Sequence, residues 1–133
     1  VLLIASNSGS NPVVTDMARE ARARGLRTIA ITSVSHATSD HARQEREARL
    51  HELVDVVIDN GGVVGDAAVE VDGLGARVAP TSTVVTTAIA NALVAEVVER
   101  LLARGIEPEV FSSSNVAGGD EVNQGHVRRA SER

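Results

Sequence analysis

The sequence predicts an α/β fold, a doubly wound parallel sheet flanked by helices. Short, continuous apolar runs alternate with helix-like segments along most of the chain, which is typical of parallel strands joined by helices. Hydrophobic residues make up 43% of the 133 residues, yet they include one Phe and neither Trp nor Tyr. The core is therefore built from Val, Ala, Leu and Ile, a composition that favours helices packed on a sheet. By length the chain is one domain.

The N-terminal segment predicts a strand, a helix and a second strand. Residues 1–5, VLLIA, form a continuous apolar run that is typical of a strand covered on both faces. After a polar heptapeptide, apolar residues recur at helical spacing from Val13 to Ala21, and Gly25 follows the last turn of this helix. Residues 26–32, LRTIAIT, then predict a second buried strand.

The rest of the chain continues the alternation. Residues 33–40 predict a loop that passes into a polar helix over roughly 41–53, and residues 53–60 predict a third strand. The glycine-rich residues 61–80 predict an irregular or short β segment. Thr81 or Ser82 is then expected to cap a long helix over 83–104, followed by a short extended piece and a C-terminal helix.

Composition excludes several classes of function. The net charge of −5 and the absence of a basic stripe or aromatic platform argue against nucleic acid as a partner. The sequence has no Cys, which removes thiol catalysis, disulfides and zinc–thiolate sites. All 13 basic residues are Arg, so a Schiff-base lysine and a Walker-type phosphate loop are also excluded within these residues.

The longest apolar stretch predicts a buried helix, not a membrane span. It covers residues 84–102 but contains Asn91, Glu96, Glu99 and Arg100. We see no signal-peptide pattern and expect a cytoplasmic protein. The chain starts at Val1, already inside a strand pattern and without Met, so we expect an earlier part of the domain to precede it.

Residues 6–12, SNSGSNP, lie where the first strand ends and the first helix begins. Ligands of open parallel sheets bind beyond the carboxyl ends of the strands, and the free N–H groups of a helix start attract anions. Gly9 permits close backbone approach, Asn11 is a good N-cap, and Pro12 fits the first helical position. Ser6, Ser8 and Ser10 add hydroxyl donors. The segment predicts either an anion cradle or a capped helix preceded by turn serines.

A second hydroxyl-rich segment opens the long helix. Residues 79–85, APTSTVV, place Thr81, Ser82 and Thr83 at its start. Taken alone, these residues are explained by helix capping. Two such helix starts in one parallel sheet could converge on one ligand, and together they predict a phosphate site.

These residues resemble a known family. Residues 1–33, with the strand, SNSGSN, the helix and a strand that ends in "IT", resemble the SIS (sugar isomerase) domain, whose signature is Ser-x-Ser-Gly-x-Thr. Residues 78–99 resemble its second element, a Ser/Thr-rich turn that opens a long helix. The sequence is also similar to a bacterial group of SIS proteins that are assigned as phosphosugar isomerases and related to phosphoheptose isomerases. The motifs that carry this similarity are NSG-x-NP, TS…H, VIDN, GDAA-x-E, APTSTVV and GGDE. Asn11 stands where many SIS domains have Thr.

The resemblance implies a flavodoxin-like, three-layer sandwich, of which residues 1–133 are the C-terminal portion of one SIS domain. It implies that the usual N-terminal helices and first strand, whose loop also touches the ligand, are absent here. It further implies a homodimer, which fits the apolar surface of the long helix, and no cofactor. The residues that it implies for binding a sugar phosphate are Ser6, Asn7, Ser8, Gly9, Ser10, Asn11, Thr81, Ser82 and Thr83.

Aldose–ketose isomerisation needs a base that moves a proton between adjacent carbons. Without Lys, Cys or Tyr, the candidates are carboxylates and imidazoles: Glu70, Glu121, His36 and His126. Three of them also have an ordinary explanation: Glu70 as an outward strand residue, Glu121 with Asp120 as a helix-start carboxylate, and His126 as a tail residue. His36 follows the second strand at the ligand-binding edge and could reach the sugar. The histidine spacing predicts no metal site.

Three functions remain open from the sequence: a phosphosugar isomerase, a non-catalytic sugar-phosphate sensor, and a lyase of the etherase type. All three would use the same phosphate cradle, and the fold does not choose among them.

Overall fold

The computed structural model describes residues 1–40 and 48–132. Their contacts divide the chain into two compact units, Val1–Ala92 and Leu93–Arg133. The first unit contains a parallel sheet of three strands in the order β1-β2-β3, and a two-stranded antiparallel sheet formed by β4 and β5. The predicted mixed α/β class and parallel strand pairing are therefore confirmed, whereas double winding stays a prediction.

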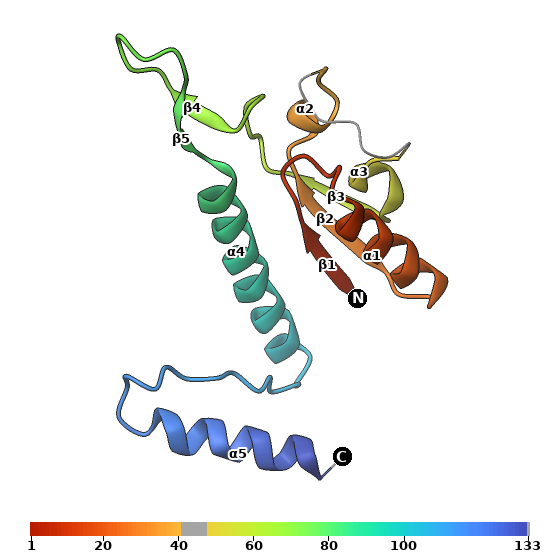
Figure 1. The fold of residues 1–133 in the computed structure, drawn as a ribbon. Coiled ribbons are helices and arrows are strands. Elements are labelled where there is room, and N and C mark those ends of the chain that lie inside the picture. The colour runs from red at the N-terminus through yellow and green to blue at the C-terminus, as the bar shows by residue number, and fades with distance from the viewer. Residues whose placement is uncertain (41–47, 133) are drawn as a thin grey trace. The chain divides into compact units, whose positions relative to one another are not determined.

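The parallel sheet is formed by β1 (Leu2–Ala5), β2 (Thr28–Thr32) and β3 (Val56–Asp59) (Figure 1). Leu2 pairs with Thr28, and Ile29 pairs with Val56. The reciprocal hydrogen bonds of Asp55 and Thr28 join the amino ends of β2 and β3: Asp55 Oδ2 accepts from the Thr28 N–H at 2.8 Å, and the Thr28 Oγ1 accepts from the Asp55 N–H at 3.1 Å. Because both strand pairs are parallel, the carboxyl ends of the three strands lie at the same edge of the sheet.

Helix α1 (Pro12–Ala23) covers one face of this sheet. Its side chains at three-residue spacing, Thr15, Ala18 and Ala21, are buried, as expected for a helix that presents a narrow face of small residues. The core cluster consists of Ile4, Ala18, Ala30 and Leu50, with Leu2, Val14, Leu53 and Val54 packed against it. On the other face of the sheet, Leu3 and Val56 are exposed by 42% and 45%.

Two short helices differ from the expected pattern. Helix α2 (Val34–Ala37) follows β2 directly, in a segment that the sequence predicts as a loop. Helix α3 (Leu50–Leu53) occupies the end of the helix predicted over 41–53, and residues 41–47, with His41, lie outside the described residues. The start of the third strand was predicted too early, since α3 takes Leu53 and β3 begins at Val56.

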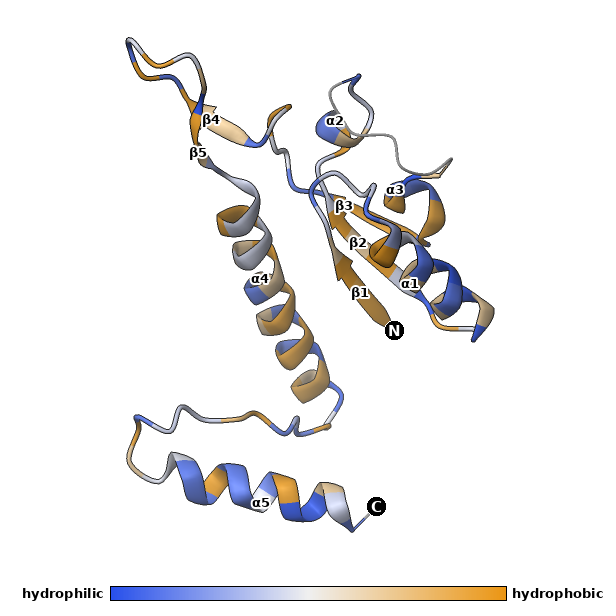
Figure 2. Cartoon of the chain, in the orientation of Figure 1, coloured by the Kyte–Doolittle hydropathy of each residue, from blue (hydrophilic) through white to orange (hydrophobic). Residues whose placement is uncertain are grey.

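The glycine-rich segment forms a hairpin. Strands β4 (Ala67–Val69) and β5 (Val78–Pro80) pair antiparallel, with Ala67 opposite Pro80. This agrees with the predicted short β segment. Directly after β5, helix α4 (Ser82–Ala103) begins, close to the predicted start. Figure 2 shows that apolar residues run along β1, β2, β3 and α4.

The second unit contains the end of α4 and helix α5 (Gly119–Ser131). Ser112 precedes α5 and is held to it by the Asn123 side chain, which accepts from the Ser112 N–H and donates to the Ser112 C=O, both at 2.8 Å. The predicted C-terminal helix is confirmed. Among the described residues, no helix is both long and apolar enough to cross a membrane.

Candidate functional site

The loop of residues 6–11 connects the carboxyl end of β1 to the start of α1. Asn11 Oδ1 accepts a hydrogen bond from the Val13 N–H at 2.9 Å, and Pro12 takes the first helical position, so the predicted N-cap of α1 is confirmed. Gly9 has φ +60, and its C=O accepts from the Leu50 N–H at 2.9 Å. A Cβ at Gly9 would lie 3.0 Å from Leu50 Cβ. The loop therefore depends on a glycine where it packs against α3.

The hydroxyl groups of this loop contact one another and the backbone. Ser8 Oγ and Ser10 Oγ lie 3.0 Å apart, and Ser6 Oγ accepts a long hydrogen bond from the Gly9 N–H at 3.3 Å. Within residues 1–40 and 48–132, nothing accepts a hydrogen bond from the N–H groups of Ser8 or Asn11. The loop thus has two backbone donors at the N-terminal end of α1, the arrangement that binds anions in proteins.

A polar network fixes Asn7 at the carboxyl edge of the sheet. The Asn7 C=O accepts from the Ser33 N–H and from Thr32 Oγ1, both at 3.1 Å. Asn7 Oδ1 accepts from Asn60 Nδ2 at 3.1 Å, and Asn60 Oδ1 accepts from the Gly62 N–H at 2.9 Å. These bonds join the residues that follow all three parallel strands, so the end of β1 is held from two sides.

The start of α4 is held by a residue that the sequence analysis did not single out. Asp66 Oδ1 accepts from the Ser82 N–H at 2.8 Å and from the Thr81 N–H at 3.1 Å. Asp66 Oδ2 accepts from Ser82 Oγ at 2.6 Å. The Thr81 hydroxyl donates to the Asp66 C=O at 3.3 Å, so the capping acceptor is Asp66 and not the Thr81 or Ser82 hydroxyl predicted for that role.

The environment of Asp66 favours its ionised form. Burial raises the pKa of Asp66, but the hydrogen bonds from the Ser82 hydroxyl and from the N–H groups of Ser82 and Thr81 outweigh burial and lower the pKa below its ordinary value. At neutral pH, Asp66 is therefore a carboxylate, and the Ser82 hydroxyl is the donor in their contact. Negative charge at the first turn of α4 is also stabilised by the helix dipole.

A cavity of about 270 Å³ lies between the two predicted segments. Its lining consists of residues 5–7 from the end of β1 and of Ser82, Thr83, Thr86 and Thr87 from the first turns of α4. The structure thus brings together Ser6 and Asn7 with Ser82 and Thr83, as the convergence of the two helix starts requires. Apart from Ala5, every described lining residue carries a hydroxyl or an amide, and none of them is charged.

The candidate acid–base residues of the first unit lie away from this lining. Glu70 follows β4 and pairs with Arg77, whose Nε donates to Glu70 Oε1 at 3.0 Å. The Glu70 side chain is 75% exposed. His36, on α2, accepts a hydrogen bond at Nδ1 from the Gly65 N–H at 3.2 Å, which leaves its other ring nitrogen to carry the proton in the neutral form. His36 thereby contacts the residue that precedes Asp66.

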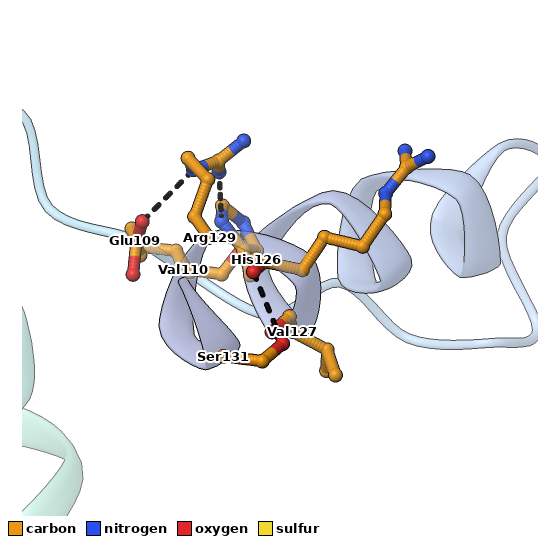
Figure 3. A network of polar contacts seen from close by, with 7 residues as sticks. Glu109, Val110, His126, Val127, Arg129 and Ser131 are labelled. Atoms are coloured by element: carbon orange, nitrogen blue, oxygen red, sulfur yellow. Dashed lines mark hydrogen bonds and ion pairs between the residues drawn. The ribbon is translucent and has the colours of Figure 1, made fainter. Parts of the chain in front are cut away.

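The other two candidates belong to the second unit, and Figure 3 shows one of them, His126. Glu121 lies with Asp120 in the first turn of α5. His126 Nδ1 lies 2.6 Å from Arg129 Nη2, and His126 Nε2 lies 3.1 Å from the Val110 C=O. Arginine only donates, so Nδ1 is the acceptor and Nε2 carries the proton that is donated to Val110. Both ring nitrogens of His126 are engaged within α5 and the segment before it.

Two residues of the site, Asn60 and Asp66, were given no role from the sequence, although they lie in the motifs VIDN and GDAA-x-E. Asn60 follows β3 in the dipeptide Asp-Asn, at the strand end where polar residues of parallel sheets meet. Asp66 follows Gly65 in a turn, and its own φ of 70 is unusual for a residue other than glycine. In the described part of the chain, no group of three or more His, Asp or Glu residues is arranged to hold a metal ion.

Comparisons with known proteins agree with the resemblance seen in the motifs. Residues 1–33 match the model of the SIS domain. The chain is 44% identical over 133 residues to a UPF0309 protein of Geobacillus thermodenitrificans, covering 100% of this chain and 53% of that protein. A UPF0309 protein of Streptomyces griseus is 45% identical over 123 residues, 92% of this chain and 49% of that protein.

A UPF0309 protein of Listeria innocua is 40% identical over 133 residues, which cover 100% of this chain and 54% of that protein. The chain spans about half the length of the curated relatives it matches. The names of these relatives state no activity, so the similarity to phosphoheptose isomerases stays a prediction. The matches support a relationship of this chain to the SIS domain family and to the UPF0309 proteins.

Proposed function

We propose that this chain forms part of a sugar-phosphate site and that the protein is an aldose–ketose phosphosugar isomerase. The observation that carries the proposal is the cavity that residues 5–7 and the start of α4 line together, where all but one of the described lining residues carry a hydroxyl or an amide. Hydroxyl and amide groups in a cavity of about 270 Å³ suit a polyhydroxyl compound. The open N–H groups of Ser8 and Asn11 at the start of α1 suit its phosphate. The SIS match over residues 1–33 covers this loop.

The proposed acid–base residues are Glu70, Glu121, His36 and His126. Isomerisation would require one of them to face C1 or C2 of the bound sugar. Because Glu70 is paired with Arg77, the carboxylate would have to exchange this partner for the substrate. A homodimer is proposed as well, since apolar residues of α4 such as Val84 and Val94 are exposed by 70% and 62%.

A second candidate function is non-catalytic sensing of a sugar phosphate. The specific observation that favours it is the cavity lining, which among the described residues contains no carboxylate and no imidazole. A binding module needs only the hydroxyl and amide contacts, whereas an isomerase needs a proton-transfer group within reach of the sugar.

Binding is tested on the full-length protein with a panel of pentose, hexose and heptose phosphates and their free sugars, followed by thermal unfolding. We expect at least one phosphate to raise the midpoint, and its free sugar to raise it much less. Ser8→Ala should weaken binding of that phosphate by about tenfold, because a hydroxyl beside the proposed phosphate position is lost. Ser35→Ala, at an exposed serine of α2, is the matched control. If no member of the panel raises the midpoint, the proposal fails.

Catalysis is tested separately by incubation of the bound sugar phosphate in deuterated water. An isomerase incorporates solvent deuterium at C1 or C2, because the base exchanges its proton with solvent during the reaction. Binding without incorporation identifies the sensor. Light scattering on the full-length protein tests the dimer, and a monomer would contradict it.

A further inference from the structure

The Asp66 carboxylate determines what the α4 side of the cavity can offer to a ligand. Its Oδ2 receives the single hydroxyl proton of Ser82 at 2.6 Å, so Ser82 Oγ has only acceptor capacity left. Its Oδ1 receives the N–H groups of both Thr81 and Ser82. Two backbone donors and one hydroxyl donor at the start of α4 are thus already bound to a carboxylate.

This arrangement is unfavourable for a phosphate at the same position. Phosphate oxygens need hydrogen-bond donors, and a neighbouring carboxylate repels them. Among the described residues, the lining of the cavity contains no Arg or His that would compensate. The loop of residues 6–11 differs because it contains no carboxylate, while its Ser8 and Asn11 N–H groups have no acceptor among the described residues. The N–H groups of Thr83 and Val84 are open in the same sense, but they follow the two groups that Asp66 binds. Sugar hydroxyls, which donate as well as accept, match a Ser82 oxygen that only accepts.

We propose that Asp66 is a positioning residue that holds Ser82 as a hydrogen-bond acceptor for a sugar hydroxyl, while the phosphate is bound by the loop of residues 6–11. The proposal rests on the proposed sugar-phosphate function and refines it. It assigns the two helix starts to different parts of one ligand, with Asp66 and Ser82 on the side that distinguishes one sugar from another.

The backbone at Asp66 allows a conservative test. Asp66 has φ 70, a left-handed conformation that Asn adopts more readily than other residues with a Cβ. In Asp66→Asn, the remaining oxygen still accepts from the N–H groups of Thr81 and Ser82. The new NH₂ group cannot accept from the Ser82 hydroxyl, which has to turn away or become a donor toward the cavity.

The experiment measures dissociation constants of the full-length protein by calorimetry, with the sugar-phosphate panel and with inorganic phosphate alone as probes. Asp66→Asn should weaken the tightest-binding sugar phosphate by about tenfold and change inorganic phosphate by less than about twofold. A double-mutant cycle adds Ser82→Ala, in which the effect of Asp66→Asn on the sugar phosphate should disappear. Ser82→Thr keeps the hydroxyl and should keep the sensitivity to Asp66→Asn.

Each outcome separates the two proposals. Equal weakening of inorganic phosphate and sugar phosphate by Asp66→Asn, or an undiminished effect in the Ser82→Ala background, overturns the role of Asp66 and leaves sugar-phosphate binding intact. Wild-type protein that binds inorganic phosphate but no sugar phosphate overturns the proposed function as well. If Asp66→Asn does not fold, Ser82→Ala decides alone, since loss of affinity for inorganic phosphate in that variant contradicts the assignment.

Discussion

The two helix starts at the cavity look alike in sequence but are built differently. Helix α1 is capped locally: the side chain of Asn11, next to the first helical residue, accepts one hydrogen bond, from the Val13 N–H. Helix α4 is capped by Asp66, which lies 15 residues before Thr81 and accepts from two backbone N–H groups and one hydroxyl. Among the described residues, each start keeps two N–H groups without an acceptor, those of Ser8 and Asn11 at α1 and those of Thr83 and Val84 at α4, but only the start of α4 also holds a carboxylate. Equal numbers of Ser and Thr therefore do not make equal anion sites.

The largest loss of stability is expected from a change in the loop before α1. Gly9→Ala should lower the free energy of unfolding by about 2–4 kcal/mol, because a Cβ at φ +60 is strained and would lie 3.0 Å from Leu50 Cβ. Urea unfolding at equilibrium measures the change. Gly25→Ala is the matched control, since Gly25 has φ +73 but no atom within 4 Å of the added Cβ. A loss in Gly9→Ala no larger than in Gly25→Ala would show that the contact with α3 is unimportant.

A direct comparison of the two caps comes next in size. Asp66→Ala should lower the free energy of unfolding by about 2 kcal/mol and Asn11→Ala by about 1 kcal/mol, because Asp66 holds three hydrogen-bond donors and Asn11 holds one. Both losses are measured by urea unfolding under identical conditions. The reverse order would mean that the hairpin and α4 hold their positions without Asp66.

A third, smaller difference between the two caps is expected in acid, because Asp66 is charged and Asn11 is neutral. The pKa of Asp66 is lowered in the folded state, and the N–H and hydroxyl of Thr28 likewise lower the pKa of Asp55. Each carboxylate therefore stabilises the fold fully above its ordinary pKa of 3.8. This contribution is lost as the pH falls below that value through the lower folded pKa.

Asp66→Asn should reduce the loss of unfolding free energy between about pH 5 and about pH 2, because one of the two linked groups is removed. Asn11→Ala, which changes a neutral cap, should shift the unfolding free energy by the same amount at every pH. Thermal unfolding across this pH range provides the measurement. An identical acid loss in wild type and Asp66→Asn would contradict the linkage.

The smallest effect on stability is expected outside the two helix starts. Glu70→Gln should change the free energy of unfolding by less than about 0.5 kcal/mol, because the Glu70–Arg77 pair is exposed on both sides, by 75% and 51%. Its effect on isomerisation is the informative part: loss of deuterium incorporation with unchanged stability and binding would identify Glu70 as the base. Full incorporation in this variant would exclude it.

The start of α1 could be predicted well from the sequence, whereas the cap of α4 could not. Continuous apolar runs, an Asn-Pro pair and a following glycine predicted β1, the cap of α1 and its end, because each of these signals acts within a few residues. The cap of α4 depends on a contact between Asp66 and residues 81 and 82, which the intervening hairpin creates. A helix start rich in Ser and Thr predicts self-capping, and only the fold reveals that a distant carboxylate takes this role.

The candidate acid–base residues were predictable only as residue types. Composition left carboxylates and imidazoles, but the partners that determine their availability come from other segments. Glu70 pairs with Arg77 across the hairpin, and His126 contacts Val110 and Arg129. In two of these three contacts the partner lies seven or more residues from the candidate in the sequence. Hydrophobic periodicity does not predict contacts between such residues.

The hairpin between Asp66 and Thr81 makes this part of the molecule a natural site for grafting. Strands β4 and β5 bring the two ends of the segment together, with Ala67 opposite Pro80, while residues 70–77 form an exposed tip. Lengthening such a tip costs little in loop-closure entropy, and exposed loop tips tolerate insertions well. A peptide tag or a small reporter domain placed at Gly73 would leave the hydrogen bonds between Asp66 and residues 81 and 82 intact. The signal of a reporter at this position would report on the nearby cavity.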